Sequence, residues 1–289
     1  MAVNPVFNRI DKEAAQRGFT SYGQQPSGSA PPQLPAYGGY PGPSETLTNE
    51  QLQDMYSQAP AGPAQTGRLT LDDVVMKSLV LFGIVVAVAA GTWWFVGPQS
   101  GLTGPIWLLG MFGSLALSFV IGFSKKVNVP LILAHAVLQG LFLGAVSSSF
   151  ESAYPGVVST AVMATMATFV GMFIGWKMGF IKVTSRSRRL FGMIAMGYLV
   201  FLLINLVAGF MGYGDGWGIY GGPLGVIVSL LGVALASYSL AVDFDSVDRA
   251  VQGGAPEKYS WLLGHGLVAS LVWLYIEFLR LFSILQSND

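Results

Sequence analysis

Seven apolar stretches follow one another along the chain from residue 71 to its end. Each holds about 20 residues, which as a helix is long enough to cross the ~30 Å hydrocarbon core of a bilayer. They cover residues 74–96, 103–123, 130–150, 155–181, 190–212, 223–244 and 260–286. Turn-forming residues lie between them, as in Gly97-Pro98 and Gly253-Gly254-Ala255-Pro256. The pattern predicts an all-α membrane protein, with seven transmembrane helices in a domain over residues 71–289.

The first 70 residues have a different pattern. Nine of the fifteen prolines lie within residues 1–63, mixed with Gly, Ser and Gln. A segment of this composition buries too little apolar surface to offset the entropy lost on ordering. We therefore predict a disordered tail over residues 1–70. No apolar segment follows Met1, so a signal peptide is not expected at this start.

The composition supports the membrane assignment and narrows the chemistry. Only 10% of the residues are charged, against roughly 25% in soluble domains. Basic and acidic residues number 15 each, so no net charge favours nucleic acid as a partner. The chain has no cysteine, which excludes disulfides and thiolate metal sites. We expect the lipid bilayer as the main partner and no bound cofactor.

Among the loops of the predicted bundle, lysine and arginine occur only in alternate ones. They lie near the start of the first stretch and in the loops after the second, fourth and sixth, whereas the other three loops have none. The basic residues concerned are Arg68, Lys77, Lys125, Lys126, Lys182, Arg186, Arg188, Arg189, Arg249 and Lys258. Because cytoplasmic loops are enriched in Lys and Arg, this predicts a cytoplasmic N-terminus and an external C-terminus in the plasma membrane.

Four ionisable residues lie in or at the edge of the last two apolar stretches: Asp243, Asp245, Glu277 and Arg280. An ionised side chain at bilayer depth costs at least ~2.5–3.5 kcal/mol, so such residues need partners. Glu277 and Arg280 have i,i+3 spacing, and Trp273 precedes Glu277 by one turn. Asp243 and Asp245 point about 200° apart on a helix, so only one of them can face the bundle interior.

Two interpretations of these charges are open. The first is a self-neutralised ion pair that only fixes helix packing. The second is a proton sensor, because burial favours the protonated form of a carboxyl group and a neighbouring cation favours its ionised form. The balance of the two effects can place titration in the physiological range.

Other polar residues within the stretches have simpler interpretations. His135 and Gln139 lie one turn apart, and Asn205 lies in the fifth stretch. We expect interhelical hydrogen bonds from them, with a role along a pore as the alternative. Ser147 to Ser149 lack a Gly-x-Ser-x-Gly turn and a well-placed histidine and acid, so we predict no enzyme activity. Small residues such as Gly140 and Gly144 favour close helix packing.

The segments around the acids resemble the transmembrane Bax inhibitor motif family. The resemblance rests on seven stretches, on Val242-Asp243-Phe244-Asp245-Ser246 closing the sixth, and on Leu274-Tyr275-Ile276-Glu277-Phe278-Leu279-Arg280-Leu281-Phe282 in the seventh. The N-terminal Asn4-Pro5-Val6-Phe7-Asn8-Arg9 and the long Pro/Gly tail are similar to the actinobacterial branch. The family implies a central seventh helix.

The resemblance also implies a function, a pH-sensitive passive calcium leak channel gated by a buried acidic pair. By motif, Asp245 matches the first gating acid and Glu277 the second, with transient calcium at both. In the expected mechanism the ionised acids attract calcium, and a shared proton or a cation bridge between the two acids closes the pore. Arg280 would supply the counter-charge, and Asp243 is a further candidate. The alternatives are a non-conducting membrane regulator that acts through its tail and basic loops, and a proton-coupled transporter.

The spacing of the two acids leads to a structural prediction. An unbroken helix from Tyr259 would place Glu277 ~27 Å along it, near the membrane face opposite Asp245. We therefore predict a break or bend at Gly264-His265-Gly266, with residues 257–264 near the cytoplasmic surface. Such a break would bring Glu277 close to Asp245.

Overall fold

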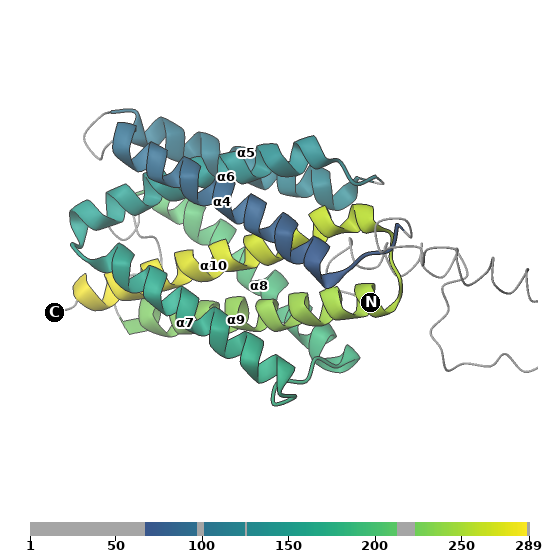
Figure 1. Ribbon diagram of the computed structural model, residues 1–289. Helices are drawn as coiled ribbons and strands as arrows, with labels where there is room; N and C mark the ends of the chain where they lie inside the picture. The colour runs from purple at the N-terminus through teal and green to yellow at the C-terminus, as the bar shows by residue number, and fades with distance from the viewer. Residues whose placement is uncertain (1–66, 97–100, 125, 213–222, 288–289) are drawn as a thin grey trace, which may run out of the picture.

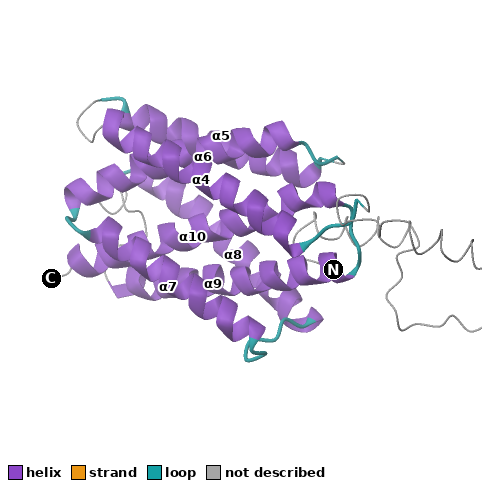
Figure 2. Ribbon diagram, in the orientation of Figure 1, coloured by secondary structure: helices purple, strands orange, loops and turns teal. Residues whose placement is uncertain are grey.

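The chain folds into a bundle of long helices. The computed structural model describes residues 67–96, 101–124, 126–212 and 223–287 (Figure 1). Those residues are helical or in loops, with no strand among them (Figure 2). The elements are α4 (Leu71–Val96), α5 (Thr103–Phe123), α6 (Val129–Ala153), α7 (Val157–Lys177), α8 (Ser185–Phe210), α9 (Pro223–Gln252), η3 (Glu257–Tyr259) and α10 (Ser260–Ser287).

All seven α-helices of the described residues are long and apolar enough to cross a membrane, which confirms the predicted fold class. The predicted tail, residues 1–70, lies outside the described residues as far as residue 66. Residues 67–70 lie against the loop between α9 and α10: the Leu69 amide donates to the Ala255 carbonyl (2.8 Å) and the Glu257 amide to the Gly67 carbonyl (2.9 Å). The chain is therefore already bound to the loop between α9 and α10 before α4 begins.

Helix α10 occupies the centre of the bundle, as predicted. It packs against α4, α6, α7 and α9. Figure 1 shows it crossing between α4 on one side and α7 and α9 on the other. In the apolar 18-residue segment of this helix 61% of the residues are buried, which is the highest fraction among the seven helices. Groups on α10 are therefore the ones best shielded from lipid and water.

The predicted break at Gly264-His265-Gly266 is wrong. Helix α10 is continuous from Ser260 to Ser287, and only η3 precedes it. Two glycines disfavour helix by roughly 1 kcal/mol each, whereas a break inside the bilayer would leave backbone groups without partners at a cost of several kcal/mol each. Gly264 also packs directly on α4, since a Cβ there would come within 3.0 Å of the Ser78 amide.

Helix α9 is longer than its apolar stretch. It extends from Pro223 to Gln252 and so carries Asp243 and Asp245 as helical residues, whereas the predicted stretch ended at 244. Helix α8 begins five residues before its predicted stretch, because Thr184 caps it: the Thr184 hydroxyl accepts from the Ser187 amide, and the Ser187 hydroxyl accepts from the Thr184 amide. The first turn of α8 thus includes Arg188.

Candidate functional site

Glu277 lies in the core of the bundle, and three side chains donate hydrogen bonds to its carboxylate. It is 1% exposed on the central helix. The Tyr198 hydroxyl on α8 lies 3.0 Å from both carboxylate oxygens, and Trp273 Nε1 lies 3.0 Å from Oε1. Arg280 forms an ion pair with Oε2. The carboxylate is therefore held by α8 as well as by its own helix.

Arg280 connects this cluster further. Its Nη2 donates to the Tyr198 hydroxyl (2.6 Å), and its Nε lies 3.4 Å from the Ser229 hydroxyl on α9. Gly232 on α9 faces the same cluster, because a Cβ there would collide with the Glu277 carboxylate and the Tyr198 hydroxyl. We call Tyr198, Ser229, Trp273, Glu277 and Arg280 the Glu277 cluster. It joins α8, α9 and α10.

Asp245 forms a second cluster with Arg188 and Arg249, nearer the other end of α9. Its carboxylate pairs with Arg188 from the first turn of α8, whose side chain is 7% exposed. Arg249 Nε, one turn along α9, lies 3.1 Å from the same Oδ2. This is a local i,i+4 pair on one helix, which the spacing of the two residues allows. The arginine from α8 is an additional partner, from a different helix.

Asp243 faces away from Asp245, as the helical spacing predicts. It is 7% exposed and accepts a hydrogen bond from the Ser270 hydroxyl on α10 (2.5 Å). The two aspartates thus serve different neighbours: Asp243 ties α9 to α10, and Asp245 ties α9 to α8.

The predicted close approach of Asp245 and Glu277 is wrong. Glu277 lies level with Gly232 on α9, thirteen residues before Asp245. At 1.5 Å per residue this separates the two acids by about 20 Å along the helix. The two carboxyl groups cannot share a proton or bridge one ion. The cause is the unbroken α10, which carries Glu277 towards the far end of the bundle.

The other polar candidates lie on α6 and α8. His135 on α6 is 2% exposed, and its Nε2 lies 2.8 Å from the Ser118 hydroxyl on α5. This contact is the interhelical hydrogen bond predicted for it. Gln139 is buried one turn further along α6, and Asn205 is half-buried on α8.

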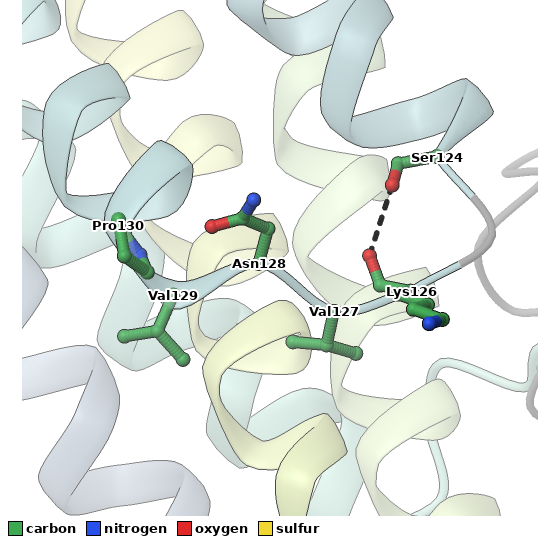
Figure 3. Close-up of a pocket in the computed structure, with 6 residues that line it drawn as sticks. All are labelled: Ser124, Lys126, Val127, Asn128, Val129 and Pro130. Carbon is green, nitrogen blue, oxygen red and sulfur yellow. Dashed lines mark hydrogen bonds between the residues drawn. The ribbon is translucent and has the colours of Figure 1, made fainter.

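No group of three or more His, Cys, Asp or Glu side chains that could hold a metal ion occurs among the described residues. An open pocket of about 700 Å³ lies at the α5–α6 loop, where the Ser124 hydroxyl donates to the Lys126 carbonyl (Figure 3). An apolar pocket of about 630 Å³ lies between α4, α6, α7 and α10. None of the candidate acids lines either pocket.

Sequence reasoning missed three partners of the acids: Arg188, Tyr198 and Ser270. The sequence pattern places Arg188 in a basic loop, whereas its pairing with Asp245 depends on the capped extra turn at the start of α8. Tyr198 and Ser270 lie 79 and 27 residues from the acids that they contact. No local spacing in the sequence connects such pairs.

Comparison with known proteins agrees with the motifs around the acids. Curated proteins give no match to this chain. A family model described as Bax inhibitor 1 like matches residues 4–287, which include all seven helices and most of the N-terminal segment. The chain therefore belongs to the Bax inhibitor 1 like family and is a multi-pass membrane protein.

Proposed function

We propose that the protein is a pH-sensitive passive calcium leak channel of the plasma membrane, with a cytoplasmic N-terminus and an external C-terminus. The observation that carries the proposal is Glu277, a carboxylate 1% exposed on the central helix and paired with Arg280. Charge at this depth is costly, and proteins retain it mainly along ion or proton pathways. Hard cations such as calcium prefer oxygen ligands, which carboxylates and hydroxyls supply.

Helix α8 is the element that both acid clusters hold. Of its described side chains only Arg188 and Tyr198 are buried. Arg188 pairs with Asp245, and Tyr198 donates to Glu277. The attachment of α8 to α9 and α10 is thus polar at its two buried points. We take α8 as the gate in the proposed mechanism.

We base the proposed gate on these contacts. It takes the place of the shared proton that the sequence led us to expect. While Asp245 and Glu277 are ionised, Arg188 and Tyr198 hold α8 against the bundle and the leak is closed. Protonation of a carboxylate removes its charge, and the ion pair with arginine is lost. Helix α8 then separates from α9 and α10, and cations pass along the opened interface. Leak should therefore rise as the pH falls.

Calcium flux into proteoliposomes, measured against pH, tests this proposal. Glu277→Gln and Asp245→Asn imitate the protonated side chains. Each should raise the flux at neutral pH and flatten its pH dependence. Glu257→Gln is the control, because Glu257 is exposed on η3 and belongs to neither acid cluster, and it should keep the wild-type profile. Unchanged pH dependence in both acid variants would rule out this gate.

The same preparation separates the leak from the alternatives. A passive leak carries calcium only down its gradient, whereas a proton-coupled transporter accumulates substrate against one. Deletion of residues 1–66 should leave the flux intact, because both acid clusters lie within the helical domain. No flux from the intact protein, together with loss of a protein partner on this deletion, would favour the non-conducting regulator that acts through its tail.

A further inference from the structure

Two histidines contact each other inside the bundle, away from both acid clusters. His135 on α6 and His265 on α10 have ring centroids 4.4 Å apart and ring planes at 86°. They are the two histidines of the whole sequence. Each lies five or six residues after the start of its helix, so both lie at the same end of the bundle.

The contacts of His135 favour a ligand at its second ring nitrogen. The ring is 2% exposed, and Nδ1 is buried with no hydrogen-bond partner, although Nε2 is bonded to the Ser118 hydroxyl. When Nε2–H donates to Ser118, the lone pair of Nδ1 is left unused. A histidine that binds a metal ion commonly donates its other ring N–H to an oxygen in this way.

Packing fixes the second ring beside the first. Gly264 contacts the backbone of Ser78 on α4, so the α10 turn that carries His265 is held closely against α4. The two imidazoles thus come from two separately anchored helices. Imidazole nitrogen suits zinc, copper and nickel, whereas calcium prefers oxygen.

We propose that His135 and His265 form a binding site for a divalent transition-metal ion, distinct from the calcium pathway. Nδ1 of His135 and one nitrogen of His265, whose ring turns about Cβ–Cγ, bind a common ion while His135 Nε2 stays bonded to Ser118, and water completes the coordination. A site with two protein ligands is weaker than the usual structural zinc site of four. An ion held there would join α6 to α10, the central helix.

Copper binding to the full chain tests the site directly, with Cu²⁺ as the probe and any polyhistidine tag removed. The electron paramagnetic resonance spectrum should show one Cu²⁺ per chain coupled to two imidazole nitrogens. No residue other than His135 and His265 supplies imidazole in this cysteine-free chain. A spectrum without imidazole coupling, or with coupling to one nitrogen alone, would overturn the proposal.

Variants provide a second measurement, by titration with Zn²⁺. His265→Phe should abolish binding, and Ser118→Ala should weaken it about tenfold or more, because it removes the oxygen that orients His135. Ser114→Ala is the matched control: that serine lies one turn earlier on α5, and its hydroxyl donates to the Met111 carbonyl. Zn²⁺ affinity that is equal in wild type and His265→Phe would contradict the site, as would an effect of Ser114→Ala equal to that of Ser118→Ala.

Discussion

At the residue scale, the central feature is a buried carboxylate whose charge is compensated by several donors. Glu277 accepts from Tyr198, Trp273 and Arg280 at 1% exposure. Such a pair adds little net stability compared with an apolar pair, yet loss of one partner is costly because the other charge stays buried. Stability and the proposed gate therefore depend on the same side chains.

Removal of Arg280 alone should destabilise the protein strongly. Arg280→Met leaves the Glu277 carboxylate without its cation, and the free energy of unfolding should fall by about 3–5 kcal/mol. Glu277→Gln/Arg280→Met removes both charges and should recover most of this loss. Unfolding in detergent micelles measures both variants. Equal stabilities of the single and double variants would show that the pair is not coupled.

Tyr198 should matter more than Ser229, although both belong to the Glu277 cluster. Tyr198→Phe deletes a hydroxyl that donates to the carboxylate and accepts from Arg280, and should cost about 1–3 kcal/mol. Ser229→Ala deletes only the long 3.4 Å contact with Arg280 and should cost less. The two melting temperatures, measured in the same detergent, decide the order. A larger loss for Ser229→Ala would contradict it.

At the scale of elements, close packing holds α6 against α4. A Cβ at Gly140 or Gly144 would come within 2.6 Å of atoms of α4, Val88 for the first and Ala89 and Thr92 for the second. Gly171 on α7 differs, since nothing lies within 4 Å of a Cβ there. The small-residue interpretation is therefore confirmed for α6, and at Gly171 no packing contact requires a glycine.

This contrast gives a paired test. Gly144→Ala should separate α4 from α6 and destabilise the fold by about 1–3 kcal/mol, as overpacking does. Gly171→Ala should be neutral or stabilising by up to about 1 kcal/mol, because alanine favours helix more than glycine. Thermal unfolding of both variants checks the prediction. Equal and large losses would mean that α7 also packs closely on a partner.

At the scale of the whole molecule, the charge of the loops predicts the orientation of the bundle. The cysteine-free sequence allows single cysteines to be introduced without background. Ser152 is exposed at the end of α6, and Lys182 is exposed between α7 and α8. Each is replaced by cysteine in a separate variant. A membrane-impermeant thiol reagent should label Ser152→Cys in intact cells and Lys182→Cys only after permeabilisation. The reverse pattern would invert the proposed orientation.

Sequence alone determined the seven helices, the family and the local pairs. Hydrocarbon thickness sets the length of an apolar stretch. Most helix ends could therefore be predicted from the sequence to within a few residues. The pairs Glu277–Arg280 and Asp245–Arg249 follow from helical spacing, and both are present. Spacing along a helix is a local property, which is why it can be read from one chain.

Tertiary structure decided which distant groups meet. Whether α10 breaks at His265 depended on packing against α4 and on the need to satisfy backbone groups in lipid, not on the two glycines beside it. That continuity separates Asp245 from Glu277 and gives each its own partner on α8, Arg188 and Tyr198. It also brings His265 against His135. These contacts join residues on different helices, and only the rotation and depth of each helix in the bundle determine them.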